Sequence, residues 1–323
     1  MRQPLSSKYK PTTLDEFSDG GDLVDVLRAF IAMDSIAVLL IGDSGSGKTS
    51  LINAIIREYY GRSLPPSHDN IITINTLKEQ GIQYYRNDVK IFCQTASAIP
   101  GKKKILLLDD LDIINEQSQQ VFRNCIDKHS DRVLFIASCC NAQKVIDSIQ
   151  SRMDIVRLRP PSVEKLTAVA ESVVSNESIS VDPEVIRFVV SVCNGSIRTL
   201  VNYMEKFRLL DCHITSEIAS RVCTNIAFSD LDTYTSLCRS GDLPGAIEMI
   251  DRFAGNGYSV TDILDSYFTY IKCTHTLPES CKYAVIPVLC KYITVFHDIH
   301  EDEIELKFFT NALVDVLTDK QNM

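Results

Sequence analysis

Apolar residues in the first half of the chain alternate between short continuous runs and segments with helical spacing. The continuous runs are rich in β-branched residues and are typical of buried strands: Ile36–Ile41, Ile71–Asn75, Ile105–Asp109, Val133–Ser138 and Ile155–Leu158. The segments between them predict helices over Leu51–Tyr60, Gln83–Thr95, Ser118–Lys128 and Ala142–Gln150. Such an alternation predicts an α/β fold, in which helices cover both faces of a parallel sheet.

The adjacent prolines Pro160 and Pro161 end this pattern, and strand signals fade beyond them. The following segment predicts a small group of helices over Val163–Ser175, Pro183–Cys193, Ile197–Leu210 and Thr215–Cys223. The last block also has helical spacing, interrupted by glycine and proline turns. We therefore expect three domains, an α/β domain over residues 1–160 and two all-helical domains over residues 161–226 and 227–323.

The turn after the first expected strand fits the phosphate-binding pattern G-x-x-x-x-G-K-S/T. Its residues are Gly42, Asp43, Ser44, Gly45, Ser46, Gly47, Lys48 and Thr49, followed by Ser50. Glycines let backbone N–H groups point inward, and a helix N-terminus adds partial positive charge. Lys48 would reach the β- and γ-phosphates, and the Thr49 hydroxyl would be a Mg²⁺ ligand. A chance glycine-rich turn is the alternative, but the flanking strand and helix favour ATP or GTP binding.

A second apolar strand ends in two acids, Asp109 and Asp110. The strand would deliver them to the carboxyl edge of the sheet, where open α/β folds bind ligands. Asp109 would hold Mg²⁺, and Asp110 would orient and polarise an attacking water. By itself, the segment fits a buried strand followed by an acidic turn equally well. The phosphate-binding pattern upstream favours the functional interpretation.

Composition excludes several classes of protein. The 33 basic and 42 acidic residues leave a formal net charge of -9, so any nucleic-acid binding must use a local basic strip or an assembled ring. The 11 cysteines form no C-x-x-C pair, which argues against a metal site or a disulfide framework and for a reducing intracellular compartment. We expect no signal peptide, because the N-terminus MRQPLSSKYK lacks an apolar core segment. We expect no membrane partner, because no apolar stretch approaches the roughly 18 to 20 residues of a membrane span.

Seven short elements, in order along the chain, resemble the small subunits of replication factor C, a clamp loader within the AAA+ ATPases. They are Lys8–Pro11 with Thr13–Phe17, Leu108–Asp112, Ser118–Arg123, Ser138–Asn141, Gln150–Met153, Gly195–Arg198, and Gly257–Ser259 with Asp262 and Ile263. The resemblance implies an AAA+ P-loop domain, an all-helical lid and an all-helical C-terminal collar for oligomerisation. It therefore gives the three expected domains their identities.

The resemblance also implies site residues. The positions near the adenine base are Ser6, Tyr9, Pro11 and Ser18. Asn141 would lie near the γ-phosphate, and Arg198 would tie the lid to the nucleotide of its own subunit. Arg152 would be an arginine finger, inserted against the ATP of a neighbouring subunit. Without the resemblance, Arg152 and Arg198 would be interpreted as ordinary helix arginines.

The implied cofactors are ATP and Mg²⁺, and the implied partners are other clamp-loader subunits in a pentamer, a sliding clamp and primer–template DNA. The positions that align with DNA-phosphate contacts are Gln80, Ile82, Arg86 and Arg123. The basic run Lys102–Lys104 is more typical of a solvated loop. The segment Val89–Gln94 fits either a clamp-facing surface or a core-facing helix. The expected location is the nucleus, or a viral replication site if the source is viral.

Departures from the family pattern keep two alternatives open. Asp110 replaces the usual glutamate, Asp43 and Ser44 replace prolines, and the segment Asn75–Gly81 lacks an expected arginine. A non-hydrolysing structural subunit would tolerate these changes. An origin-recognition or helicase-loading ATPase is the other alternative, and it predicts winged-helix strands after residue 230, where the sequence predicts helices.

Overall fold

The computed structural model describes residues 3–20, 22–61, 69–75, 82–274, 276–298 and 302–319. Within these ranges, only the backbone is described for residues 18–20, 75, 82–86, 296–298 and 319. The chain divides into two compact units. One contains Met1–Ile179 and Gly195–Cys212, and the other contains Ser180–Asn194 and His213–Met323.

The first unit contains a five-stranded sheet in the order β2-β3-β4-β1-β5. The strands are β1 Ala37–Ile41, β2 Ile71–Asn75, β3 Lys104–Asp109, β4 Val133–Cys139 and β5 Asp154–Arg157. Each neighbouring pair is parallel, and Leu39 of β1 pairs with Ala137 of β4 and Ile155 of β5. All five predicted strands are therefore confirmed, with small shifts at their ends.

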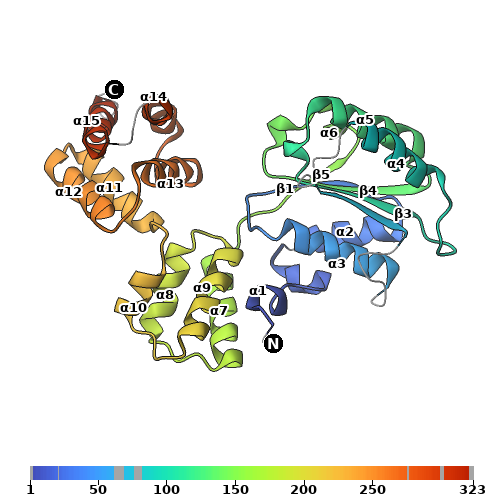
Figure 1. Ribbon diagram of the computed structural model, residues 1–323, viewed down its shortest axis with the longest axis horizontal. Coiled ribbons are helices and arrows are strands. Elements are labelled where there is room, and N and C mark those ends of the chain that lie inside the picture. The colour runs from blue at the N-terminus through green and yellow to red at the C-terminus, as the bar shows by residue number, and fades with distance from the viewer. Residues whose placement is uncertain are drawn as a thin grey trace. The chain divides into compact units, whose positions relative to one another are not determined.

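Helices cover both faces of this sheet because successive strand residues point to opposite sides. Val38 and Leu40 belong to one core, shared with helices α2 Asp22–Ala32 and α3 Lys48–Tyr60. The residue between them, Leu39, belongs to another core, shared with α4 Ile82–Gln94 and α5 Glu116–His129. Figure 1 shows α2 and α3 on one face and α4, α5 and α6 on the other. The predicted parallel sheet with flanking helices is confirmed.

One helix prediction is wrong. In place of a continuous helix over 142–150, the chain forms a 3-10 turn, η3 Ala142–Lys144, an extended pair and a short helix, α6 Asp147–Gln150. Two glutamine side chains replace the helical hydrogen bonds: the Ile146 N–H donates to Gln119 Oε1 at 2.9 Å, and Gln150 Nε2 donates to the Val145 carbonyl at 2.8 Å. Helical periodicity does not reveal such side-chain bonds.

The N-terminal segment contains helices that the apolar pattern did not predict. They are α1 Leu5–Lys8, the 3-10 helix η1 Leu14–Gly20, and α2. Leu5, Leu14 and Leu27 are buried completely or nearly so, each with at most 1% of its surface exposed. Tertiary packing therefore stabilises these short elements, which are too short to be stable alone.

The remaining helices extend to the C-terminus. The first unit holds α7 Val163–Glu177 and α9 Ile197–Leu210, and a further short 3-10 helix, η2 Leu111–Ile113, follows β3. The second unit holds α8 Pro183–Val192, α10 Ser216–Val222, α11 Phe228–Ser240, α12 Leu243–Gly255, α13 Val260–Cys273, α14 Glu279–Asp298 and α15 Glu303–Asp319. None of the helices in the described ranges is long and apolar enough to span a membrane.

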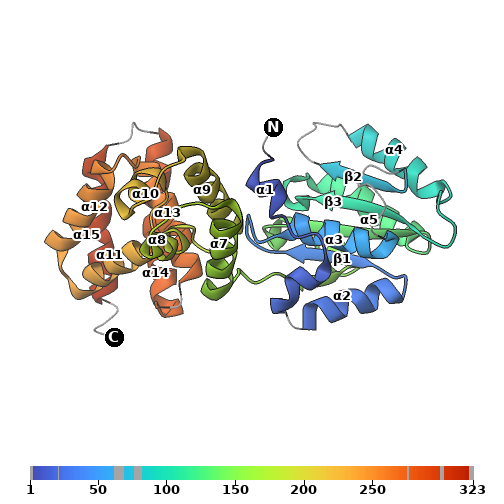
Figure 2. The ribbon, with the colours of Figure 1, turned by 90° about the horizontal axis from the view of Figure 1, so that it is seen from below.

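Aromatic side chains form the centre of the second unit. Tyr234 and Tyr267 are each 1% exposed and pack edge to face. Their hydroxyls are bonded to threonines, Tyr234 Oη to Thr310 Oγ1 at 2.9 Å and Thr235 Oγ1 to Tyr267 Oη at 3.2 Å. Figure 2 shows α15 beside α11 and α12. The predicted all-helical C-terminal region is confirmed, and the three-domain division stays a prediction.

Candidate nucleotide site

The phosphate loop joins the end of β1 to the start of α3. Gly45 and Gly47 have φ angles of 82° and 95°, a left-handed conformation that glycine adopts without steric cost. The Ser46 N–H donates to the Asp43 carbonyl at 3.2 Å, and the Leu51 N–H donates to the Gly47 carbonyl at 2.9 Å. The loop therefore closes on itself and leads directly into the first turn of the helix.

Lys48 lies inside this loop with only 7% of its surface exposed. Its ammonium donates to the carbonyls of Gly42 at 2.7 Å and Asp43 at 3.0 Å, and it is 3.2 Å from Cys140 Sγ. Phosphate oxygens form stronger, charge-assisted hydrogen bonds than carbonyls do. The ammonium is therefore held where a phosphate bound in the loop would become its best acceptor.

The Ser46 hydroxyl gives an independent test of the fit. Its oxygen is buried, and no hydrogen-bond partner for it exists within the described part of the chain. A Cβ at Gly42 would lie 2.8 Å from this hydroxyl and 3.3 Å from the Leu158 carbonyl oxygen, so a larger residue at position 42 would displace the hydroxyl. A buried hydroxyl without a partner costs free energy. A phosphate oxygen in the loop would satisfy it, and the residues present therefore fit a nucleotide phosphate.

Ser138 of β4 organises the acids that follow β3. Its hydroxyl donates to Asp109 Oδ1 at 2.6 Å and accepts from the Asp110 N–H at 3.1 Å. The pairing of Leu108 with Ala137 explains this contact, because it sets the next residues of both strands side by side. In the sequence, Ser138 is recognisable only as part of a strand-end motif, because its contacts depend on the strand register, which the sequence alone does not reveal.

Asp110 has the electrostatic surroundings of a general base. Burial raises the pKa of its carboxyl, and the negative charge of Asp109 raises it further, while Lys48 and Arg198 act in the opposite direction. Its backbone is left-handed, with φ 54° and ψ 53°, a conformation that aspartate tolerates better than most residues. Perturbed pKa values and uncommon backbone angles both concentrate at functional sites.

Asp112 holds the loop that carries Asn141. Its Oδ2 accepts from the N–H groups of Cys140 at 3.2 Å and Asn141 at 3.0 Å. The Asn141 side chain in turn accepts from the Gln143 N–H at 2.9 Å. Sequence reasoning did not single out Asp112, although it is the third acid of the motif Leu108–Asp112. Its position in that motif was the sequence signal that could have identified Asp112.

The start of α9 lies against the tip of the phosphate loop. A Cβ at Gly45 would lie 2.6 Å from Ser196 Oγ and 3.6 Å from Arg198 Cβ. Ser196 caps the helix by accepting from the Thr199 N–H at 3.2 Å. The predicted Arg198 therefore reaches the site together with a helix N-terminus, which carries partial positive charge. Ser196 was quoted only within the motif and was not predicted as a site residue.

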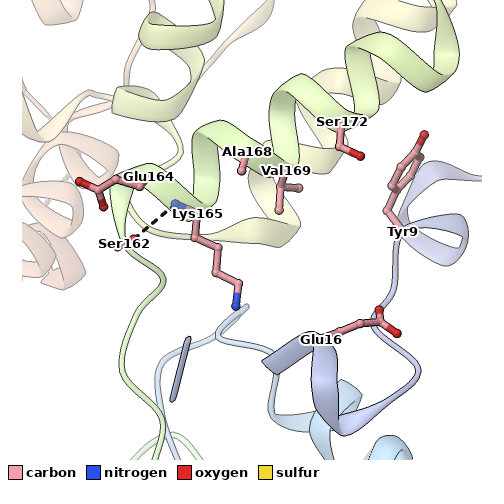
Figure 3. Close-up of a pocket in the computed structure, with 8 residues that line it drawn as sticks. All are labelled: Tyr9, Glu16, Ser162, Glu164, Lys165, Ala168, Val169 and Ser172. Atoms are coloured by element: carbon pink, nitrogen blue, oxygen red, sulfur yellow. Dashed lines mark hydrogen bonds between the residues drawn. The ribbon is translucent and has the colours of Figure 1, made fainter. Parts of the chain in front are cut away.

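A cavity of about 490 Å³ lies between the N-terminal segment and α7. Tyr9 and Glu16 line one side of it, and the other side is formed by Ser162, Glu164, Lys165, Ala168, Val169 and Ser172 (Figure 3). Its volume is within the range of small-molecule sites. Of the residues predicted near the base, Tyr9 lines this cavity. The residues of α7 were not predicted.

Glu177 fixes Tyr9 and the N-terminal segment to α7 and α9, in an arrangement that we call the N-terminal latch. It accepts from Lys8 Nζ at 2.5 Å, Tyr9 Oη at 3.1 Å and an Arg208 nitrogen at 3.1 Å. These donors, Lys8 first, lower the pKa of the Glu177 carboxyl to about 2. The Leu5 N–H also donates to Glu205 Oε2 at 2.5 Å.

The other predicted residues lie as follows. Thr49 and Ser50 are half-buried in the first turn of α3, Asp43 and Ser44 are exposed in the loop, Ser6 is exposed on α1, and Pro11 is half-buried. The side chain of Ser18 lies outside the described residues, as do Gln80 and the side chains of Ile82 and Arg86, whose backbone belongs to α4. The roles of these residues stay predictions.

Arg152 bonds to α5 and α6. Its Nε donates to Asp127 Oδ1 at 2.5 Å, and its Nη1 donates to the Ser148 carbonyl at 2.7 Å. Arg123, a predicted DNA contact, lies on the other side of the same carboxylate, with its Nε 3.6 Å from Asp127 Oδ2. The hydrogen bond from Arg152 and the charges of both arginines lower the pKa of Asp127.

Comparison with known proteins shows which proteins this chain resembles. Residues 38–161, which contain the phosphate loop and both acids, match the ATPase family associated with various cellular activities, AAA. A putative replication factor C small subunit of Acanthamoeba polyphaga mimivirus is 25% identical over 287 residues, which is 88% of each chain. A replication factor C small subunit of Methanoregula boonei is 28% identical over 246 residues, 76% of each chain. The chain therefore contains an AAA ATPase domain and is similar over most of its length to replication factor C small subunits.

Solved structures support the same fold. The Holliday junction branch migration motor RuvB of Thermotoga maritima superimposes with a TM-score of 0.54 at 17% identity, over 73% of this chain and 80% of that chain. At this level of identity, the likeness concerns the fold alone. The predicted resemblance and the AAA+ fold class are thus confirmed. The AAA family also implies nucleotide binding, usually with Mg²⁺.

Proposed function

We propose that this AAA+ protein is an ATP-hydrolysing subunit of a hetero-oligomeric clamp loader, which opens a sliding clamp and loads it onto primer–template DNA in replication and repair. The observation that carries the proposal is the assembly of the phosphate loop, the acids after β3 and the start of α9 around one place. Relatives named replication factor C small subunits, matched over 76% to 88% of the chain, supply the biological context.

Different residues of this chain would have different roles in the proposed ATPase. Lys48 and the loop amides would hold the phosphates of ATP. Thr49 and Asp109 would hold Mg²⁺, which supplies neutralisation of phosphate charge. Asp110, with its raised pKa, would orient and deprotonate the attacking water. The cavity beside Tyr9 is the proposed nucleobase site.

Arg152 and Arg123 would serve the assembly. We propose that Arg152 enters the nucleotide site of a neighbouring subunit and stabilises charge on the transferring phosphoryl group. Arg123, with Gln80, Ile82 and Arg86, would contact DNA phosphates. The helical region after residue 226 would form the collar of a pentamer. The expected location is intracellular; the relatives described above are viral and archaeal, so a viral replication site suits the proposal better than a nucleus.

Reconstitution with partner subunits, the clamp and primed DNA tests the proposal. Lys48→Ala should abolish ATP binding by the isolated chain. Arg152→Ala should leave that binding intact but lower turnover by the assembly on the order of 10³-fold, the typical effect of losing an arginine finger. Absence of clamp loading by the wild-type assembly, or full turnover with Arg152→Ala, would contradict the proposal.

Two alternative functions make different predictions. An ATPase rate unchanged by Asp110→Ala would identify a structural subunit that holds nucleotide only for assembly. A helicase-loading ATPase would be expected to carry a winged-helix domain. The described residues after 230 form helices and contain no strand, which does not favour that reading.

A further inference from the structure

Asp127 lies between the two arginines to which the proposed function gives different tasks. Its Oδ1 accepts from Arg152 Nε at 2.5 Å, whereas its Oδ2 lies 3.6 Å from Arg123 Nε. Arg123 and Asp127 are four residues apart on α5, and Arg152 follows α6. One carboxylate of α5 therefore faces both a predicted DNA contact and the predicted finger.

The two contacts are unequal. The distance to Arg152 is that of a charge-assisted hydrogen bond, and the distance to Arg123 is too long for one. In addition, Arg123 Nε is buried and has no hydrogen-bond partner within the described residues. The Arg123 guanidinium is thus incompletely satisfied, and a phosphate oxygen is the acceptor best suited to it.

We propose that Asp127 is a positioning residue, through which contact between a DNA phosphate and Arg123 fixes the orientation of Arg152. The inference rests on the proposed function and adds a route by which DNA regulates the shared site. A carboxylate between two guanidinium groups divides its attraction between them. When a phosphate neutralises Arg123, Asp127 keeps Arg152 as its remaining cationic partner, and that ion pair tightens.

The activity of an arginine finger depends on the orientation of its guanidinium group. A guanidinium stabilises the transferring phosphoryl group only when its donors are aimed at the developing charge. The Ser148 carbonyl already holds one Arg152 nitrogen at 2.7 Å, so the strength of the second bond, to Asp127, decides how much freedom the guanidinium plane keeps. Loss of that bond would leave Arg152 present but poorly directed.

The test compares Asp127→Asn with wild type in the assembly with partner subunits, clamp and primed DNA. Two quantities are measured: kcat at saturating DNA, and the DNA concentration that gives half-maximal stimulation. We expect kcat to fall roughly ten- to hundredfold, the cost of misplacing a catalytic group. The half-maximal DNA concentration should stay equal or fall, because Arg123 loses a competing anion. Arg123→Ala should instead raise that concentration.

Control variants distinguish a positioning role of Asp127 from a general effect on the fold. Asp131→Asn removes the same charge from an exposed acid that pairs with Arg132 at 3.4 Å, and it should leave both quantities unchanged. Asp127→Glu restores a carboxylate and should recover part of kcat. The exposed fraction of Asp127 is 38%, so its ion pairs add little stability and the variants should fold, which thermal unfolding checks.

The outcomes distinguish the inference from the proposed function. Wild-type kcat or a raised kcat in Asp127→Asn would overturn the inference while leaving the function intact. Equal effects of Asp127→Asn and Asp127→Glu on kcat would also overturn it. If the wild-type assembly shows no stimulation by DNA, or Arg152→Ala turns over normally, the proposed function fails and the inference falls with it.

Discussion

At the scale of single residues, Gly45 meets two independent demands. Its φ of 82° is left-handed, and the space where a Cβ would project is filled by Ser196 Oγ at 2.6 Å. Gly61 shares the first demand but not the second, since its φ is 87° and nothing lies within 4 Å of an added Cβ. A comparison of substitutions at the two glycines therefore distinguishes the effect of backbone strain from the effect of contact with α9.

We predict that both variants lose stability: Gly45→Ala by about 1–2 kcal/mol, the cost of a left-handed alanine, and Gly61→Ala by about 1–3 kcal/mol, because its φ of 87° and ψ of 158° lie in a region essentially restricted to glycine. Only Gly45→Ala should also lose nucleotide affinity, about ten- to hundredfold, because overpacking against α9 costs a further 1–3 kcal/mol. Urea unfolding and fluorescent ATP-analogue binding measure the two effects. Equal affinities in the two variants would show that the α9 contact does not matter for binding.

Asp110 leads to a pH prediction at the same scale. The carboxyl must be ionised to accept a proton, and burial together with the charge of Asp109 raises its pKa above the ordinary aspartate value of 3.8. Turnover should therefore decline as pH falls through a pKa above that value, and activity should be restored as pH rises. The measurement is kcat against pH, with nucleotide binding followed over the same range. An acidic limb at or below 3.8 would contradict the assignment.

At the scale of elements, Gln119 connects α5 to the loops around it. The side chain is fully buried and donates to the carbonyls of Ile114 at 2.8 Å and Lys144 at 2.9 Å, while it accepts from the Ile146 N–H. It therefore replaces the backbone bonds that a continuous helix over 142–150 would have made.

Replacing Gln119 with leucine should lower the free energy of unfolding by about 3 kcal/mol, because a buried backbone group left without a partner costs about 1–3 kcal/mol. Gln120 is exposed on the same helix, and Gln120→Leu is the matched control, with an expected change within about 0.5 kcal/mol. Urea unfolding of both variants decides. A similar loss in both would mean that leucine is simply unfavourable on α5.

The N-terminal latch makes a prediction that depends on pH. The pKa of Glu177 is lowered from 4.5 to about 2, so its stabilising contribution is complete above pH 4.5 and disappears as pH falls toward 2. The difference in unfolding free energy between wild type and Glu177→Gln should therefore be largest near neutral pH and shrink across that window. Glu171→Gln, an exposed change on the same helix, should show no such trend.

Local patterns made the sheet and the phosphate loop predictable, because each depends on residues adjacent in sequence. The bonds of Ser138, Asp112 and Gln119 were not predictable in this way. They join positions that only the strand register and the path of the loops bring together. Helix α2 was missed for a related reason, since it is stabilised by burial of Val24 and Leu27 against the sheet domain.

At the scale of the whole molecule, the net charge of -9 limits DNA binding. We predict that the isolated chain binds duplex DNA more weakly than about 10⁻⁴ M at physiological salt, the weak end of non-specific binding. The reconstituted assembly should bind more tightly and lose affinity steeply as salt rises. Arg123→Ala should reduce the slope of the logarithm of the binding constant against the logarithm of the salt concentration by about 1 for each altered subunit. Fluorescence anisotropy at several salt concentrations measures this, and tight binding by the isolated chain would contradict it.

The two compact units exchange the polypeptide three times, at 179–180, 194–195 and 212–213. A single protease cut at one of these crossings would leave two pieces without a covalent link, and they would stay associated because at least one unit contains segments of both pieces. Nicked protein should therefore migrate as fragments under denaturing conditions yet elute as one species in native buffer. No continuous stretch of the chain contains one complete unit without part of the other. Separate expression of one unit therefore requires a circularly permuted or two-piece gene.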